Sequence, residues 1–191
     1  MLKIDQDKLA SIFDAMGTKT IMVIGDLMLD HYIWGKVERI SPEAPVPVVE
    51  VHEEKYKLGG AGNVANNLLS LGASVIMSGV KGMDAHGDIL IDILNQSGIP
   101  TSKILSDPGK GTIVKTRVIA HTQQVVRLDR ENRSTIPDHI RDEMIREVRD
   151  CIQAVDAIII SDYAKGVVSR ELISEVVNLT RGNGVIVCVD P

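Results

Sequence analysis

A chain of 191 residues, 44% hydrophobic and 25% charged, is long enough to bury one substantial core and has the composition of a globular protein. Its net charge of −5, without any basic block, argues against nucleic acid as the main partner. The longest apolar runs, such as residues 185–189, are far too short to span a bilayer, and the N-terminus lacks the pattern of a signal peptide. We therefore expect a cytoplasmic protein with no membrane partner.

Strand and helix patterns alternate along the chain. Continuous apolar runs, typical of strands covered on both faces, occupy residues 20–25, 73–79, 156–160 and 185–189. Helical patterns occupy residues 63–71, 88–96 and 138–154, and a last helix is capped by Ser169 and ends at Gly182. Strands alternating with helices of this length predict an α/β fold with a mostly parallel sheet flanked by helices.

Two segments interrupt this alternation. Residues 31–57 contain three prolines before an apolar run, which indicates an edge or irregular strand. Residues 112–129 have the pattern of a β-hairpin with its turn at residues 121–124. Together they predict one small sheet beside the α/β core. Its apolar face needs a covering surface, which a ligand beneath a lid or a dimer contact would each provide.

The cysteines and histidines suggest no metal site. Cys151 and Cys188 have neither metal-site spacing nor enough neighbours for a disulfide framework, and we interpret them as buried free thiols in a reducing compartment. The five histidines are scattered without ligand spacing, and we predict no bound metal at them.

Carboxylates follow the first predicted strand, at the edge where open parallel sheets bind ligands. Asp26 and Asp30 lie there, and each can accept hydrogen bonds from sugar hydroxyls. The structural alternative is that Asp26 caps a turn and Asp30 is a solvated loop residue. A second group follows the third core strand, where Asp162 and Lys165 share a loop that ends at Gly166. A salt bridge within that loop is its structural alternative.

A glycine cluster at residues 59–62 opens a helix just before Asn63. Glycine lets a small polyol approach the backbone closely, and Asn63 and the first helical N–H groups can donate to it. The spacing matches neither a dinucleotide-binding fingerprint nor a P-loop, and a plain tight turn also explains it. On the predicted hairpin, Lys115, Arg117 and Arg127 alternate with apolar residues, which suits either phosphate recognition or a solvated strand face.

Taken in order, these motifs resemble the ribokinase (PfkB) family of sugar kinases, and within it the kinases that act on heptose 7-phosphate. The resemblance covers the chain essentially from end to end and makes residues 1–191 an incomplete ribokinase-like domain with lid segments 31–57 and 112–129. The proline-containing ribbon is its most specific part. The motifs that carry it lie at residues 25–30, 39–49, 59–65, 123–129, 161–166 and 189–191.

The resemblance implies transfer of the ATP γ-phosphate to O1 of D-glycero-D-manno-heptose 7-phosphate, for lipopolysaccharide synthesis. It also implies ATP and Mg²⁺ as cofactors of the complete enzyme, neither binding tightly to this chain, and a homodimer formed through the lid. Sugar-binding positions follow from the matching motifs, with Asp26 added by its position and three lid residues as closing groups. The implied substrate-binding residues are Asp26, Asp30, Gly59, Gly60, Asn63, Arg117, Gln124, Arg127, Asp162 and Lys165.

The chain departs from the family pattern in one respect. The family places its catalytic base in a Gly-Ala-Gly-Asp motif well C-terminal to the segment that matches Val189-Asp190-Pro191, and no such motif occurs in the 191 residues. The resemblance therefore implies that the base lies beyond Pro191. We expect the sugar-binding half of the enzyme, without a catalytic residue and inactive alone. Two alternatives stay open: a kinase of the same family for another sugar or nucleoside, and a non-catalytic dimerising sugar-binding module.

Overall fold

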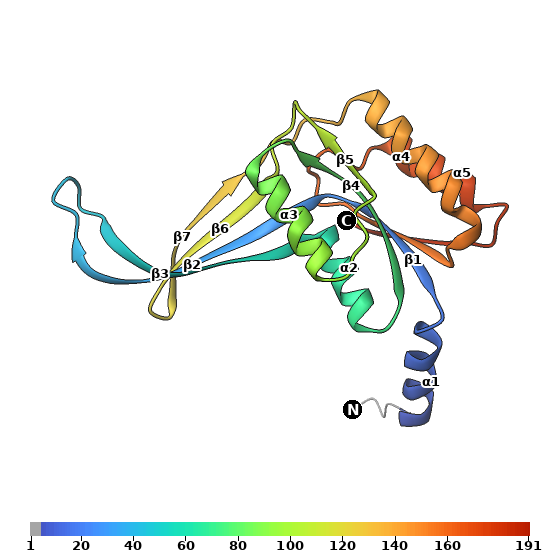
Figure 1. The fold of residues 1–191 in the computed structure, drawn as a ribbon, viewed down its shortest axis with the longest axis horizontal. Coiled ribbons are helices and arrows are strands. Elements are labelled where there is room, and N and C mark those ends of the chain that lie inside the picture. The colour runs from blue at the N-terminus through green and yellow to red at the C-terminus, as the bar shows by residue number, and fades with distance from the viewer. Residues whose placement is uncertain (1–4) are drawn as a thin grey trace.

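The structure is a computed structural model that describes residues 5–191, and it contains two β-sheets with helices packed around one of them (Figure 1). Within the described residues, no helix is both long enough and apolar enough to cross a membrane. The helices are α1 (Gln6–Met16), α2 (Ala61–Ser70), α3 (Ala85–Gln96), α4 (Asp138–Cys151) with a short 3₁₀ turn η1 (Ile152–Ala154) after it, and α5 (Arg170–Thr180).

The core sheet has five strands, all parallel, as the apolar runs predict. Each strand of the inner three is buried because helices cover both faces of the sheet. In spatial order the strands are β5 (Lys103–Asp107), β4 (Ser74–Gly82), β1 (Thr20–Gly25), β8 (Ala157–Ser161) and β9 (Ile186–Asp190).

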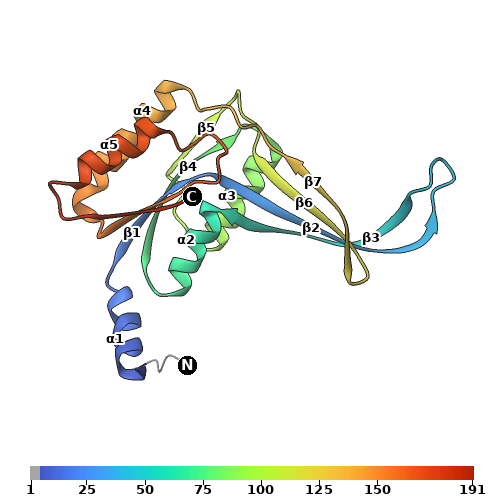
Figure 2. The ribbon, with the colours of Figure 1, turned by 180° about the vertical axis from the view of Figure 1, so that it is seen from behind.

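The two faces of the core sheet pack against different helices. Met22 and Ile24 of β1 are fully buried in a cluster with residues of α4 and α5. Val23, which points to the opposite face, is fully buried in a second cluster with residues of α2 and α3. Figures 1 and 2 show the two helix pairs on opposite sides of the sheet. This layered core fixes the edge at which β1 and β8 end.

The second sheet, called the lid sheet below, joins the two segments that interrupt the α/β alternation, and this prediction is confirmed. β2 and β3 are antiparallel, as are β6 and β7, while β2 and β6 pair in parallel. Only Asp26 separates β1 from β2, so the lid sheet projects directly from the core (Figure 1). In spatial order its strands are β3 (Pro47–Gly60), β2 (Leu27–Ile40), β6 (Ile113–Ala120) and β7 (Gln123–Arg130).

Three features differ from the sequence-based predictions. The run at residues 185–189 predicts a strand covered on both faces with a buried thiol, but β9 lies at the sheet edge and Cys188 is exposed. Helix α1, which is capped by Asp5 and buries none of its residues, is absent from the sequence-based predictions. Strand β5 was not predicted either, since polar residues interrupt its short apolar run.

Asp84 ties helix α3 to the start of β6. Its carboxylate accepts hydrogen bonds from the backbone N–H of Gly87 at 2.8 Å and of Thr112 at 2.9 Å. Partial burial raises the pKa of Asp84, but these hydrogen bonds outweigh it, and the net pKa lies below the usual 3.8. The ionised carboxylate therefore stabilises the fold.

We expect Asp84→Ala to lower the free energy of unfolding by about 1 kcal/mol at neutral pH, the usual cost of a lost helix cap. Because the folded-state pKa is depressed, this contribution is present above the unfolded pKa and is lost as pH falls through the folded pKa. Urea unfolding at about pH 7 and about pH 3 measures the difference. Asp92→Ala, on the exposed side of the same helix, is the control and should change little at either pH. An Asp84 effect of equal size at both pH values would contradict the prediction.

Candidate functional site

The carboxyl edge of the core sheet is where β1 passes into the lid sheet. Gly25 and Ser161, at the ends of β1 and β8, lie so close that a Cβ on Gly25 would be 2.1 Å from the Ser161 carbonyl oxygen. Only glycine fits at this position. The two strand ends therefore hold the first lid strand against the loop that follows β8.

A cavity of about 360 Å³ opens between this edge and the lid sheet. That volume is in the range of small-molecule sites. It brings together residues from β2, β3, α2, β6 and the loop after β8. The lining residues are Met28, Asp30, Tyr32, Lys57, Leu58, Gly59, Gly60, Asn63, Lys115, Arg117 and Tyr163.

The glycine cluster forms the floor of this cavity. Gly60 has a φ of +53°, and a Cβ there would be 2.4 Å from the Asp26 carbonyl oxygen. A Cβ on Gly59 would be 2.9 Å from a carboxylate oxygen of Asp30. The backbone contact and the positive φ at Gly60 require glycine, whereas a Cβ at Gly59 would displace the Asp30 side chain. Gly60, the N-cap residue of α2, has no side chain to cap the helix, but the Ala61 N–H donates to the Asp26 carbonyl oxygen at 3.0 Å. Asn63 is the residue of α2 that lines the cavity.

Asp30 is held by Arg117 from the neighbouring strand. The guanidinium donates to a carboxylate oxygen of Asp30 at 2.5 Å, and both side chains are about three quarters buried. The Arg117 guanidinium also lies over the ring of Tyr32, 5.4 Å from its centroid. This pair fixes the direction of the carboxylate while leaving it at the cavity surface.

Asp26 has a different position from the one expected. It is fully buried, does not line the cavity, and accepts hydrogen bonds from the backbone N–H groups of Tyr163 (2.9 Å), Lys165 (3.0 Å) and Val167 (3.2 Å). Burial raises the pKa of Asp26, and the three N–H donors partly offset this rise. In the structure Asp26 holds the loop at residues 162–167 from outside the cavity, and its predicted part in sugar binding stays a prediction.

The loop after β8 presents Tyr163 to the cavity in place of the two residues predicted. Asp162 accepts a hydrogen bond from the Ala164 N–H at 2.8 Å, and Lys165 pairs with Glu131 at 2.7 Å. Ala164, between them, has a φ of +54°, and neither Asp162 nor Lys165 lines the cavity. Lys165 is thus paired with a residue outside its own loop, and its predicted ligand contact stays a prediction.

Two predicted lid residues lie outside the cavity. Gln124 and Arg127 are exposed on β7, and Arg127 donates two hydrogen bonds of 2.7 Å to the carboxylate of Asp129. This bidentate pair leaves Arg127 little free charge for a ligand. The sequence-based predictions do not include three residues that line the cavity: Tyr32, Lys57 and Tyr163. The alternation of side chains along β2 and β3 nevertheless places Tyr32 and Lys57 on the same face of the sheet as Asp30.

The last strand, β9, ends at the same carboxyl edge but contributes nothing to the cavity. The backbone N–H of Asp162 donates to the carbonyl oxygen of Asp190 at 2.9 Å, which ties the end of β9 to the loop after β8. Pro191, the next residue, is exposed and does not line the cavity. The chain thus reaches the edge of the site at Pro191 without adding a side chain to it, and the placement of the catalytic base beyond Pro191 stays a prediction.

A second hollow, of about 420 Å³, lies between α4 and α5 on the outer helical layer. Its residues Arg141 and Arg146 are paired with acidic residues of α4, so their charges are already neutralised. It contains neither a glycine turn nor a strand end. The cavity below the lid sheet is therefore the candidate functional site.

The described residues contain no cluster of metal-ligating side chains. Across residues 5–191, no group of three or more His, Cys, Asp or Glu side chains is arranged to hold one. We therefore assign no step to Mg²⁺ or to bound ATP within this part of the structure.

Comparison with known proteins identifies the family. A profile of pfkB family carbohydrate kinases matches residues 18–191. The chain is 43% identical over 187 residues to the bifunctional protein HldE of Trichlorobacter lovleyi, covering 98% of this chain and 38% of that protein. It is 46% identical over 173 residues to HldE of Helicobacter pylori strain J99, covering 91% and 37%. The chain thus spans less than two fifths of these relatives.

Solved structures agree on the fold. A phosphofructokinase-like protein from Staphylococcus aureus superimposes with a TM-score of 0.72 at 17% identity, covering 90% of this chain and 53% of that one. Arabidopsis thaliana ribokinase complexed with ribose and ATP gives 0.61 at 14% identity, covering 91% and 53%. The predicted ribokinase-like α/β fold is therefore confirmed, and the chain belongs to the pfkB family of carbohydrate kinases.

Proposed function

We propose that this chain is the sugar-binding and lid half of a kinase that phosphorylates D-glycero-D-manno-heptose 7-phosphate at O1. The product is the 1,7-bisphosphate, and the pathway is the ADP-heptose branch of lipopolysaccharide core synthesis. Two findings support this: the family match, and relatives named HldE at 43% and 46% identity. The observation that carries the proposal is the cavity in which a fixed carboxylate, Asn63 at the start of α2 and several cations meet.

Each lining group suits a phosphorylated polyol. Asp30, oriented by Arg117, accepts hydrogen bonds from sugar hydroxyls. Gly59 and Gly60 let the ring approach the backbone, and Asn63 supplies both a donor and an acceptor. Tyr32 and Tyr163 also line the cavity, and their hydroxyl groups can donate or accept hydrogen bonds.

In the reaction, a bond forms between O1 of the sugar and the γ-phosphorus, and the bond from that phosphorus to the bridging oxygen of ADP breaks. ADP leaves, and the O1 proton passes to a general base. In the family that base belongs to a Gly-Ala-Gly-Asp motif, which this sequence does not contain. The residues described here therefore bind and orient the sugar, and we expect no turnover by the chain alone.

We also propose a cytoplasmic homodimer formed through the lid sheet. Both cysteines are free, in keeping with a reducing compartment. Val125, Val126 and Leu128 of the edge strand β7 are between 42% and 56% exposed, an apolar surface that a second lid would cover. Sedimentation of the purified chain at several concentrations tests the dimer, and a monomer throughout would reject it.

Calorimetric titration of the purified chain tests the function. We expect heptose 7-phosphate to bind, Mg-ATP not to bind tightly, and no bisphosphate to appear by phosphorus NMR when both are present. Asp30→Asn should weaken sugar binding about tenfold or more, since it removes a charge-assisted acceptor. Binding of an unrelated sugar or nucleoside in preference to heptose 7-phosphate would reject the substrate, and turnover with ATP would reject the proposed inactivity.

A further inference from the structure

Two lysines flank Asp30 across three neighbouring strands of the lid sheet. Asp30 of β2 lies opposite Lys57 of β3 on one side and opposite Lys115 of β6 on the other. Residues opposite one another in a sheet point to the same face. All three side chains accordingly line the cavity.

Neither lysine is neutralised. Asp30 pairs with Arg117, and among the described residues neither Lys57 nor Lys115 forms an ion pair. Asp129 lies opposite Lys115 in the register with β7, but Arg127 holds its carboxylate at both oxygens. The two ammonium groups thus face the cavity with their charge available.

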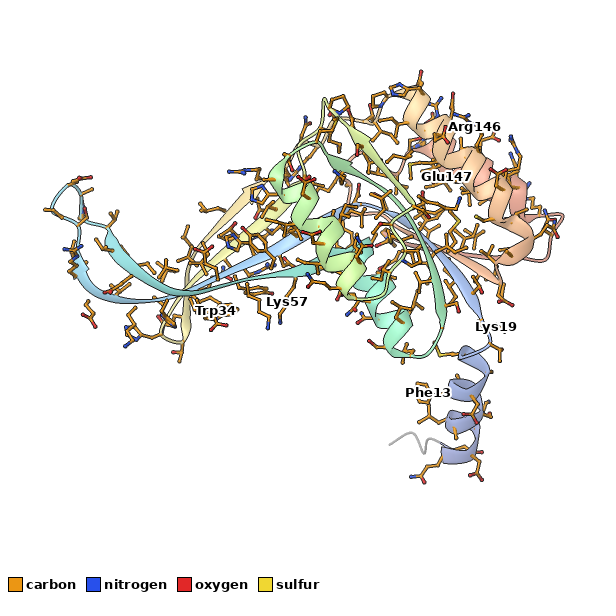
Figure 3. All side chains as sticks on the ribbon, in the orientation of Figure 1. Phe13, Lys19, Trp34, Lys57, Arg146 and Glu147 are labelled. Atoms are coloured by element: carbon orange, nitrogen blue, oxygen red, sulfur yellow. The ribbon has the colours of Figure 1, made fainter. Side chains whose placement is uncertain are left out.

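Each ammonium group forms a cation–π contact with an aromatic ring, which does not neutralise its charge. The Lys57 nitrogen lies 5.5 Å from the ring centroid of Tyr32, and the Lys115 nitrogen lies 5.7 Å from that of Tyr163. Such cation–π contacts are weak compared with binding to a phosphate. In Figure 3, Lys57 projects near the junction of lid sheet and core, closer to the core than Trp34.

The charge of the cavity is opposite to that of the chain. Its ionisable lining consists of three cations, Lys57, Lys115 and Arg117, and one carboxylate, Asp30, so its formal charge is 3 − 1 = +2. The whole chain carries −5. A phosphate monoester carries about −1.5 to −2 at neutral pH. The negative charge of a phosphorylated ligand therefore balances the excess positive charge of the residues that line the cavity.

We propose that Lys57 and Lys115 bind the phosphate that the sugar already carries, while Asp30, Asn63 and the glycine turn bind its hydroxyls. This assignment rests on the proposed function and refines it, because it names the residues that make the site prefer a sugar phosphate to a free sugar. It differs from the expectation that Arg117, Gln124 and Arg127 close over the sugar or its phosphate. Arg117 orients Asp30 instead, and the other two lie outside the cavity.

The test is calorimetric titration of the full chain and of Lys57→Met and Lys115→Met, which remove the charge and keep an unbranched side chain of similar size. Each protein is titrated with heptose 7-phosphate and with unphosphorylated heptose. Lys55→Met is the matched control, because Lys55 is exposed on the same face of β3 but does not line the cavity. We expect each cavity variant to lose about tenfold in affinity for the phosphorylated sugar and nothing for heptose. Unchanged heptose binding also shows that the variant is folded.

Two outcomes overturn the assignment. In the first, the variants bind heptose 7-phosphate as tightly as the unmodified chain does. In the second, the variants lose affinity for heptose 7-phosphate and for heptose by the same factor. A second pair of ligands, a hexose 6-phosphate and its hexose, separates the assignment from the choice of substrate. If only the hexose phosphate binds and its advantage over hexose depends on the lysines, the assignment holds and the heptose proposal fails. If no phosphorylated sugar binds with a lysine-dependent advantage, the assignment fails.

Discussion

Asp26→Ala should lower the free energy of unfolding by roughly 3 to 5 kcal/mol, among the largest effects expected of any substitution in the described chain. The carboxylate is fully buried and accepts three backbone N–H bonds from the loop after β8. Alanine leaves those donors without partners inside the protein, and each such buried group costs about 1 to 3 kcal/mol. Urea unfolding followed by circular dichroism measures the loss.

Asp162→Ala is the matched control for this substitution. Asp162 lies in the same loop and accepts one backbone N–H bond, from Ala164, in a partly exposed position. Water can replace that bond, so we expect a loss of about 1 kcal/mol or less. Equal effects of the two substitutions would show that Asp26 does not organise the loop.

Lys110→Met should lower the free energy of unfolding by about 3 kcal/mol, which is the second large effect we expect. The ammonium is nearly buried and donates to the carbonyl oxygens of Asn132 (2.9 Å), Ser134 (2.7 Å) and Lys165 (2.7 Å). Burial lowers the pKa of Lys110, while Asp26 and Asp107 counteract that shift. Methionine keeps the volume and removes all three donors. Lys103→Met, at a half-buried lysine of β5 that forms no ion pair within the described residues, should change stability little.

The two substitutions should be coupled. Asp26 accepts the N–H of Lys165, and Lys110 donates to the carbonyl of the same residue, so both hold one stretch of backbone. Once either contact is lost and the loop is displaced, removing the other costs less. We expect the double variant to be less destabilised than the sum of the two single effects. Strict additivity would mean that the loop responds to each residue independently.

The sequence predicts those parts of the site that follow directly from local patterns and from the order of strands and helices along the chain. The apolar runs give the parallel core, the carboxyl edge follows from it, and the glycine cluster and Asp30 fall at that edge. These predictions succeed because a buried strand and a glycine turn are local patterns.

The remaining site residues depend on geometry that one sequence does not reveal. Asp26 and Asp30 look equivalent in sequence, yet one is buried against backbone N–H groups and the other lines the cavity. In the loop after β8, Tyr163 lines the cavity while its charged neighbours Asp162 and Lys165 do not. Lys57 is recognisable only after the register of β3 against β2 places it beside Asp30.

The parallel pairing of β2 with β6 has a consequence for how the protein folds. The β2–β3 hairpin is local and can form early, but Asp30 and Arg117 are 87 residues apart, and the α2, β4, α3 and β5 elements lie between them. Closing so long a loop costs entropy that is recovered only after the intervening elements have packed. The cavity is therefore completed late, and a nascent chain acquires its ligand site only after most of its core has formed.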